Sequence, residues 1–595
     1  MAEPVAAAEN PLEQLHRPQP GELALTVRAV AVGCLLGGVV SAMNIYFGLR
    51  TGWSIGGSLI AAILGYSFFA AVPFGKGYTV LEANITQTAG SAAGTMTSAA
   101  GLLACIPAMG MLGYDLSYLE LTLWAGSIAY LGVFFAVPLR RQMVVVEQLR
   151  FPTGTATANT IVAMFASGDE AIRKSRVLIR WGIGAAVFTL VSFFVPQLAH
   201  PPPEWLGAVG VSLGALGFSL LISPLMAGAG ILIGMRVGAS LFLGAVFSWG
   251  ILGPWVQTQG WATGAFMSYS DGVRGWILWP GVAIMVGDAL TQLGLSWRSI
   301  LNTFKSAGNS GEAEDRTASD EQIPNSWWMG GLAVATLATV VSAKVLFEIP
   351  IHLSVIAVAL SSVLAAIAVR STGETDINPI GGMGKVTQLV FGGLAPGAMA
   401  TNLMAAGIAG AGASQAGDMM QDLKTGYLLG ASPRRQMIAQ FCGVACGILF
   451  CVPIYKLFDT AYDIGGEELP APAAHAWRAM AELLANGLEA LPANAEAAVV
   501  GGFAFGVLMP LIKKFVPSVA AWLPSGLAFG IAFIVPAYYS VAMFLGAVLF
   551  LAWSKKAPQA ATALGFAVAS GLIAGEGLMG IVTAVLTLLG FGALT

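Results

Sequence analysis

The chain has 595 residues, of which 56% are hydrophobic and only 10% are charged, and its formal net charge is −3. About a quarter of the residues in soluble domains are charged, so a soluble protein is excluded, and the small net charge gives no reason to expect a nucleic-acid partner. Apolar runs of about 20 residues recur along the sequence. We therefore predict an all-α polytopic membrane protein with about 14–16 transmembrane helices in two related halves, in which re-entrant or broken helices line a central pathway.

The N-terminal part is predicted to be a cytosolic tail, residues 1–22, followed by the first transmembrane half, residues 23–295. The tail has no basic segment ahead of an apolar one, so it is not a signal peptide. Small and polar residues interrupt the apolar pattern at Thr79–Gly101 and at Phe151–Phe165. Because basic residues flank Phe151–Phe165 on both sides, we expect a re-entrant hairpin there that begins and ends in the cytoplasm.

Residues 296–325 are hydrophilic and have the composition of a flexible cytosolic linker. They join the second transmembrane half, residues 326–595, in which residues 459–494 form an acidic loop with one short helix predicted at Ala473–Leu488. By the positive-inside rule, the clusters of basic residues face the cytoplasm, which leaves the acidic loop on the outer side. These clusters are Arg140–Arg150, Arg173–Arg180, Arg298–Lys305, Arg434–Arg435, Lys513–Lys514 and Lys555–Lys556.

The stretch Asp376–Gln436 is apolar enough for a bilayer but unusually rich in Gly, Ala, Ser, Thr, Asn and Gln. Small residues let helix backbones approach closely inside a membrane. Gly or Pro interruptions at membrane depth are tolerated where the backbone is buried in protein or lines a cavity. We therefore expect this stretch to line the transport pathway.

Fragments recur between the two halves in the same order, about 300 residues apart, which indicates an internal duplication. The pairs are Asn84–Gln87 with Lys385–Gln388, Phe242–Val246 with Phe544–Val548, and Gly287-Asp288 with Gly575-Glu576. Asp288 and Glu576 each lie in the middle of an apolar run, where a charge costs at least about 2.5 kcal/mol. We expect them to be proton-carrying or gate acids. The structural alternative is a protonated acid that bonds another helix.

Asp418, Asp422 and Lys424 are charged residues that we expect at a cytoplasmic gate. The pattern Asp418-x-x-Gln421 is that of a capping box at a helix start, and Lys424 could neutralise one of the two acids. Glu82 also fits a capping box, with Thr79, and a cap and a substrate-site role are weighed equally. Ser432-Pro433 is predicted to begin a helix as cap and first residue.

Neutral polar side chains in the small-residue stretches offer both donors and acceptors, which suits a ligand with amides, carboxylates and amines. For any single residue, an ordinary hydrogen bond between helices is the stronger interpretation; as a set, they favour a pathway lining. The predicted substrate-binding residues are Asn44, Tyr46, Glu82, Asn84, Gln87, Thr155, Asn159, Gln388, Asn402, Ser414 and Gln415.

Other site classes have no motif in this sequence. There is no GxxxxGK[ST] phosphate loop, so ATP does not drive this chain directly, and no Gly-x-Ser-x-Gly or His-Glu-x-x-His motif indicates an enzyme. The four histidines are scattered and the five cysteines lie in apolar context. We therefore predict no metal site, no cofactor and no disulfide framework.

The motif Gly373-Glu-Thr-Asp376-Ile-Asn-Pro379, followed by Asp422-Leu-Lys424-Thr-Gly426 and on through Gln436, resembles the signature of the oligopeptide transporter family, in its prokaryotic branch. Asn44–Trp53, Glu82–Gly94 and Phe151–Asn159 are similar to the family's N-terminal pattern. The yellow stripe-like transporters of metal chelates belong to the same superfamily. The resemblance covers the chain from about Ala24 onward.

The resemblance implies a multi-pass secondary active transporter in a bacterial inner membrane, generally proton-coupled. It implies import of short oligopeptides or peptide-like molecules, with a metal–chelator complex of the siderophore type as the alternative. A channel is the rival from another class, since Gly-rich stretches also occur in pores. The expected partners are the substrate, protons and the lipid bilayer. The oligomeric state is left open, with a homodimer as one option.

Overall fold

A computed structural model describes residues 15–592 of the chain apart from 167, 270, 298–300, 302–320 and 521. The described chain is helical, with one isolated bridge between Ile464 and Leu469. The helices are α1 (Val27–Thr51), α2 (Ser58–Ala71), α3 (Val80–Gly94), α4 (Met96–Ala99), α5 (Cys105–Gly110), α6 (Tyr118–Arg140), α7 (Pro152–Ala166), α8 (Gly168–Phe194), α9 (Gly207–Ala215), α10 (Pro224–Ala245), α11 (Gly253–Thr258), α12 (Val273–Leu295), α14 (Asn325–Phe347), α15 (Ile351–Thr375), α16 (Ile380–Leu394), α17 (Met399–Leu429), α18 (Pro433–Ala461), α19 (Pro472–Asn486), α20 (Glu496–Phe515), α21 (Gly526–Ile534), α22 (Ala537–Lys556) and α23 (Pro558–Leu588).

Within the described residues, eleven helices are long and apolar enough to cross a membrane. The polytopic all-α class is therefore confirmed, and this count over the described residues is lower than the predicted 14–16 transmembrane helices. Other apolar segments form helices too short to be included in this count, such as α2, α5 and α21. Of these three helices, α21 is buried at both ends, whereas α2 and α5 end at exposed residues.

Two local predictions are wrong. Phe151–Phe165 does not form a hairpin: α7 is one helix of 15 residues. The pattern Asp418-x-x-Gln421 does not begin a helix, because both residues lie inside α17, which runs unbroken for 31 residues. An acid three residues before a Gln is also a normal spacing on a helix face, so the pattern alone does not fix a helix end.

Other local predictions are confirmed. The hydroxyl of Thr79 and the carboxylate of Glu82 form a capping box at the start of α3. The Ser432 hydroxyl accepts from the Arg435 amide, and Pro433 opens α18. The short helix predicted in the acidic loop is α19. Most of the predicted linker 296–325 and residues 1–14 of the predicted tail lie outside the described residues.

α10 is broken at Gly234, whose φ of 74° and ψ of 174° no helix contains. Gly230 before the break and Gly238 after it both face Ala547 of α22, so the chain does not continue in a straight line. Beyond the break, the ring of Phe242 stacks on that of Phe544, with centroids 4.7 Å apart. This discontinuous helix is of the kind expected from the Gly-rich sequence.

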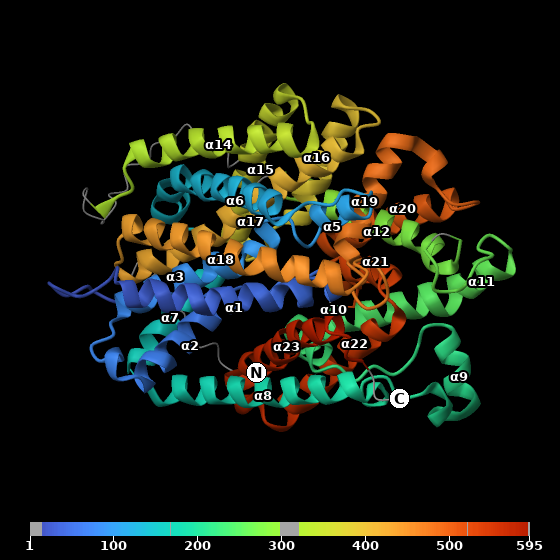
Figure 1. The fold of residues 1–595 in the computed structure, drawn as a ribbon, viewed down its shortest axis with the longest axis horizontal. Coiled ribbons are helices and arrows are strands. Elements are labelled where there is room, and N and C mark those ends of the chain that lie inside the picture. The colour runs from blue at the N-terminus through green and yellow to red at the C-terminus, as the bar shows by residue number, and fades with distance from the viewer. Residues whose placement is uncertain are drawn as a thin grey trace.

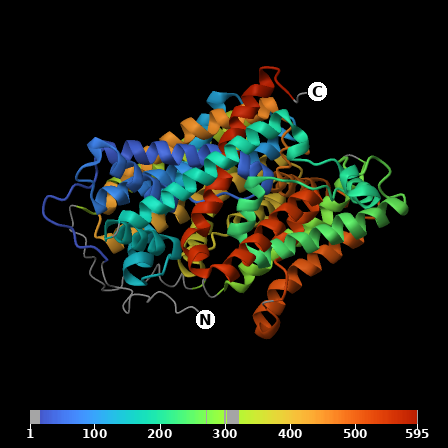
Figure 2. The ribbon, with the colours of Figure 1, turned by 90° about the horizontal axis from the view of Figure 1, so that it is seen from below.

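Most long helices run across the page in Figure 1, with α14 along the upper edge and α8 along the lower edge. α8 packs on α23, α10 on α22 and α12 on α20. In Figure 2, seen from below, the teal α8 lies on the near side of the molecule and crosses the red C-terminal helices. α17, by contrast, is buried over nearly its whole length.

The helices α1, α3 and α18 pack with their backbones in close approach. Two GxxxG motifs make this contact possible, Gly33–Gly37 on α1 and Gly443–Gly447 on α18. A Cβ at Gly37 would lie 2.3 Å from the carbonyl oxygen of Gly90 on α3, and one at Gly443 would lie 2.4 Å from that of Ala89. The Gly- and Ala-rich composition of α3 thus serves helix packing on two sides.

We expect Gly37→Leu to lower the free energy of unfolding by about 1–3 kcal/mol, because the added side chain meets the backbone of α3 rather than a movable side chain. Thermal unfolding in detergent checks this. Gly184→Leu on α8 is the matched control, since no other group lies within 4 Å of its Cβ position. Equal unfolding midpoints for the two variants would contradict the packing argument.

Candidate functional site

Glu576, on α23, is a buried acid whose carboxylate is fully engaged. It accepts hydrogen bonds from the Ser223 hydroxyl at 2.8 and 2.9 Å and from the Leu225 amide at 2.8 Å. Arg50 Nη1 lies 3.1 Å from Oε1 and forms an ion pair with it. The Arg50 guanidinium also lies 4.5 Å from the centroid of the Tyr46 ring. Glu576, Arg50 and Tyr46 together line a cavity of about 490 Å³.

Asp288, on α12, is also buried, but its surroundings differ. Its carboxylate accepts from Gln292 Nε2 at 2.5 Å and interacts with the backbone N–H of Leu527 at the start of α21. A Cβ at Gly526 would lie 2.5 Å from Asp288 Oδ1, so the acid sits directly against that helix end. Within the described residues no cation lies at ion-pair distance from Asp288.

The cavity beside Asp288 has a volume of about 670 Å³ and is lined by charges of both signs. Lys385 on α16 and Lys513 on α20 lie on its wall together with Asp288. The Lys513 ammonium donates to the carbonyl oxygen of Pro524 at 2.6 Å. Lys385 is 3% exposed, so its ammonium is held away from bulk water. A ligand with both a carboxylate and an amine would find complementary groups in this cavity.

Asp288 and Glu576 meet equivalent partners from the opposite part of the chain. Ser223-Pro-Leu225 opens α10 and Ser525-Gly-Leu527 opens α21, and in each case the serine is the N-cap. Each acid faces the amide of the leucine. Amides at a helix start point at an anion and the helix dipole favours negative charge there, which explains how carboxylates are accommodated at these positions.

Asp418 and Asp422 lie one turn apart on the same side of α17, deep in the protein. The Ser91 hydroxyl donates to Asp418 Oδ2 at 2.9 Å, and the Ser58 hydroxyl lies 3.4 Å from Asp422 Oδ1. The two serine oxygens are 2.8 Å apart. Lys424 does not neutralise either acid, because its ammonium points toward the ring of Tyr427, 5.8 Å from the centroid.

Two of the predicted substrate-binding residues serve local structure. Asn44 holds the segment that follows α1 in place. Its side chain donates to the Ile55 carbonyl at 2.9 Å and accepts from the Ile55 amide at 3.0 Å. Glu82 pairs with Arg28 at 2.6 Å in addition to its capping box with Thr79. Glu82 therefore caps α3 and pairs with Arg28, and no contact to a substrate is needed to explain its position.

Thr155 and Asn159, on α7, are separate from the buried polar residues. Asn159 is exposed and donates to the Thr155 carbonyl at 2.9 Å, and the Thr155 hydroxyl donates to the Arg150 carbonyl at 2.6 Å. Tyr46 lies on the cavity beside Glu576. The predicted set is thus divided among several places rather than gathered in one.

The remaining predicted residues are buried amides on α3, α16 and α17, with Ser414 also buried on α17. Gln388 donates to the Trp477 carbonyl at 2.9 Å, and Asn402 donates to the Gln388 carbonyl at 2.7 Å. A buried polar atom without a partner costs about 1–3 kcal/mol. Several such atoms, counted over the described residues only, occur in this set: Asn84 Nδ2, Gln87 Oε1, Gln388 Oε1, Asn402 Oδ1 and Gln415 Oε1.

The sequence reasoning missed Arg50, Lys385 and the two pairs of serines, Ser223 with Ser525 and Ser58 with Ser91. Arg50 lies within Asn44–Trp53 and Lys385 opens one of the repeated fragments, so both stood in motifs that had been noticed. A basic residue inside an apolar run is a signal of the same kind as an acid there. The serines carried no signal, because hydroxyls are common in membrane helices.

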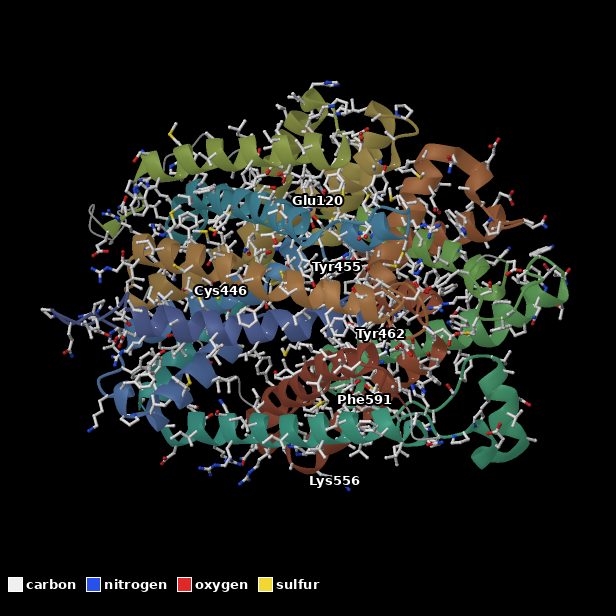
Figure 3. The ribbon with its side chains drawn as sticks, viewed as in Figure 1. Glu120, Cys446, Tyr455, Tyr462, Lys556 and Phe591 are labelled. Carbon is white, nitrogen blue, oxygen red and sulfur yellow. The ribbon has the colours of Figure 1, made fainter. Side chains whose placement is uncertain are left out.

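A third cavity, of about 810 Å³ and also polar, lies where α18 and α19 approach α5. Tyr455 and Tyr462, labelled in Figure 3, are on its wall. Lys456 bridges Asp115 and Asp459 there at 2.8 and 2.9 Å. The cavity therefore presents aromatic rings and charges of both signs.

His475, on α19, is buried beside this cavity. Its ring stacks on Tyr269 with centroids 4.3 Å apart, and Nε2 lies 3.0 Å from the Gly465 carbonyl oxygen. Burial lowers the pKa of His475 from its ordinary value of 6.5 to about 4. Because α19 lies in the loop between α18 and α20, outside the spanning helices, this shift concerns the loop's stability in water.

We expect the protein to lose stability as the pH falls from about 6.5 toward 4. In that window the unfolded chain binds a proton at His475 that the folded chain does not bind, so unfolding is favoured by about 1.4 kcal/mol per pH unit. Thermal unfolding midpoints between pH 7 and 4.5 check this. His475→Gln is expected to reduce the slope, whereas the exposed His352→Gln control keeps it; parallel curves for both would contradict the prediction.

The sequence was compared with known proteins. A family model described as "OPT oligopeptide transporter protein" matches residues 24–587. A Saccharomyces cerevisiae protein named putative oligopeptide transporter YGL114W is 27% identical, and the alignment covers 95% of this chain and 96% of the yeast protein. The probable metal-nicotianamine transporter YSL5 of Oryza sativa is 28% identical over 98% of this chain and 96% of its own length. The metal-nicotianamine transporter YSL3 of Arabidopsis thaliana is 26% identical, with 96% and 92% covered.

The family model extends from the start of α1 to the end of α23, so it covers every candidate site described above. The relatives align over nearly their whole length, which means that no large part of those proteins lacks a counterpart in this chain. This polytopic membrane protein therefore belongs to the OPT oligopeptide transporter family, and it is a transporter and not an enzyme.

Proposed function

We propose that this protein is a secondary active transporter that imports short oligopeptides or peptide-like molecules together with protons. The observation that carries the proposal is the 670 Å³ cavity in which Asp288 lies together with Lys385 and Lys513. A peptide has an amine at one end and a carboxylate at the other, so it matches a wall that presents both charges. The family supports the same class of substrate, since the yeast relative is named an oligopeptide transporter.

Asp288 and Glu576 are the acids proposed for proton coupling or gating. Glu576 is held by Arg50 and by the start of α10, which suits a gate that opens when the ion pair separates. Asp288 faces a cavity without a cation at ion-pair distance among the described residues. Full retention of pH-driven uptake in both Asp288→Asn and Glu576→Gln would mean that neither acid takes part in coupling.

We propose that residues 23–295 and 326–595 are related halves of opposite orientation, in a bacterial inner membrane, as the resemblance to the prokaryotic branch implies. The equivalent partners of the two acids support the duplication. Ser525 follows Ser223 by 302 positions, and Leu527 follows Leu225 by the same number. Lys513 lies beside Asp288 and belongs to a cluster predicted to be cytoplasmic. Asp288 would then face the cytoplasm and Glu576 the outer side.

A metal–chelator complex is the second candidate substrate. Several relatives that align over most of this chain are named metal-nicotianamine transporters. Within the described residues, no group of three or more His, Cys, Asp or Glu could hold a bare metal ion. A chelate brings its own ligands to the metal and would instead present carboxylates and amines to the protein, which the same cavity could bind.

Uptake into proteoliposomes tests the proposal and separates its alternatives. A labelled tripeptide mixture and an iron–nicotianamine complex are supplied outside, with and without an inward proton gradient. Gradient-dependent accumulation of peptides supports the first candidate, and accumulation of the complex alone supports the second. Flux that neither saturates nor shows counterflow would indicate a channel and would contradict both.

A further inference from the structure

We propose that Asp418 and Asp422, linked through the hydroxyls of Ser91 and Ser58, form a buried site that holds one proton and relays it along α17. The inference rests on the proposed function, because it identifies where a coupling proton binds. It assigns this role to two carboxylates in the interior of α17 and to serines of α2 and α3. Neither Asp288 nor Glu576 belongs to this chain of groups.

The first argument is the absence of a counter-charge. Both carboxylates belong to residues that share one helix side, and Asp422 is 1% exposed. In the described part of the chain, no Lys, Arg or His side chain lies at ion-pair distance from either acid. Asp418 is partly exposed. The buried Asp422 lies close to this second carboxylate without a cation, and like charges at one site favour a shared proton.

Charged groups on the neighbouring helices are engaged elsewhere. Glu82 on α3 pairs with Arg28 of α1. Arg370 on α15 pairs with Glu147. Arg435 on α18 pairs with Glu321. The others on the elements packed against α17 are Glu120 and Arg140 on α6, Arg141 directly after α6, Lys344 on α14, His352 and Glu374 on α15, Lys385 on α16, Arg434, Lys456 and Asp459 on α18, and His475, Arg478 and Glu482 on α19, while α2, α4, α5 and α7 contain no charged side chain.

The second argument is a count of hydrogens. The four oxygens lie in the order Asp418 Oδ2, Ser91 Oγ, Ser58 Oγ and Asp422 Oδ1, with separations of 2.9, 2.8 and 3.4 Å. Three hydrogen bonds need three hydrogens, and two hydroxyls supply only two. The two hydroxyl hydrogens suffice for the two short links, and a hydrogen on a carboxyl group completes the third, which at 3.4 Å is the longest. The chain is therefore complete when the pair of acids carries one proton.

The third argument is the presence of unused acceptors next to the pair. Asp422 Oδ2 and Gln87 Oε1 are buried and, within the described residues, have no hydrogen-bond partner. The Gln87 side chain also contacts Asp422. When the shared proton lies on Asp422 Oδ2 rather than in the chain of four oxygens, it supplies the donor that Gln87 Oε1 lacks, at a place where an unpaired buried acceptor costs about 1–3 kcal/mol.

The chain of oxygens permits transfer of the proton once Ser58 Oγ and Asp422 Oδ1, which are 3.4 Å apart, approach to ordinary hydrogen-bond distance. Asp422 gives its hydrogen to Ser58 Oγ, Ser58 gives its own to Ser91 Oγ, and Ser91 gives its own to Asp418 Oδ2. Three O–H bonds break and three form, while the negative charge moves from Asp418 to Asp422. The two acids are separated by about 6 Å along the helix axis, and Asp422 is the nearer to Leu428, whose carbonyl accepts from the Leu15 amide.

Infrared difference spectroscopy of the full-length protein in lipid tests the site without any substrate. The wild type at pH 7 is expected to show a C=O stretch of one protonated carboxylic acid that shifts in D₂O. Asp418→Asn and Asp422→Asn are each expected to abolish this band, because the new amide supplies the third hydrogen and leaves the remaining acid ionised. Ser361→Ala is the matched control, a buried serine that donates to a carbonyl of α17 at 3.1 Å.

Ser58→Ala is a second variant for the case that an aspartate variant does not fold. Loss of the Ser58 hydroxyl is expected to shift the frequency of the C=O stretch. A wild type without such a band, or a band that no variant in Asp418, Asp422 or Ser58 changes, would overturn the inference. A band that responds as expected, in a protein whose uptake of the tripeptide mixture ignores the proton gradient, supports the site and contradicts the proposed coupled transport instead.

Discussion

Glu576→Ala is expected to lower the free energy of unfolding by about 3–5 kcal/mol, because it removes one partner of a buried ion pair. Arg50 would keep the Glu468 carbonyl and the rings of Tyr46 and Tyr539 as neighbours but would lose its counter-charge. The Ser223 hydroxyl and the Leu225 amide would lose their acceptor as well. The unfolding midpoint in detergent measures the effect.

Two further variants separate the ion pair from the space that the side chain fills. Glu482→Ala removes a partner of Arg478 in a partly exposed pair on one helix, which is worth only about 0.3–0.5 kcal/mol. The double variant Arg50→Met with Glu576→Leu is expected to recover most of the lost stability, since no isolated charge is left buried. A midpoint for Glu576→Ala within error of that for Glu482→Ala would show that the pair contributes little.

The composition was sufficient to predict the class of fold, but it predicted more spans than the eleven long apolar helices of the described residues. A run of Gly, Ala and Val has the same hydropathy whether it faces lipid or other helices, and length alone separates the two cases. α2 has 14 residues and α21 has nine, so neither crosses a bilayer. α21 packs on α10 and α12, which are far away in the sequence, and local pattern reading does not detect such contacts.

Short-range patterns were reliable where the interaction is itself short-range. The capping box of Thr79 and Glu82 joins residues three apart, and it formed as predicted. The same pattern failed at Asp418, because a helix begins where its first amides lack partners, and α17 begins 19 residues earlier at Met399. A capping pattern therefore needs an independent signal for a helix start, such as the proline that follows Ser432.

The candidate site was predicted in part for a related reason. The acids Asp288 and Glu576 stand out in an apolar sequence, so both were found. Their partners lie far away in the sequence. Glu576 is 526 residues from Arg50 and 353 residues from Ser223. Nothing in the sequence connects them, because such contacts arise from helix packing. The same holds for Ser58 and Asp422, which are 364 residues apart.

Asp288→Asn is expected to raise the KM for uptake of tripeptides with a free amino terminus about ten- to a hundredfold. The reason is that a hydrogen bond to a charged group contributes about 1.5–3 kcal/mol, and Asp288 is the acid that faces the 670 Å³ cavity. Lys385→Gln is expected to act in the same way on peptides with a free carboxyl terminus. Uptake by proteoliposomes measures both effects.

Chemically blocked peptides make the two variants distinguishable from general damage to the transporter. N-acetylated tripeptides lack the charge that Asp288 would bind, so their weaker uptake should not change further in Asp288→Asn but should still fall in Lys385→Gln. Amidated tripeptides should show the reverse. Lys555→Gln, at the exposed end of α22, is the control for loss of a positive charge. Equal losses for free and blocked peptides would place the effect on folding or on the transport cycle, and the cavity would then not be a site for the peptide termini.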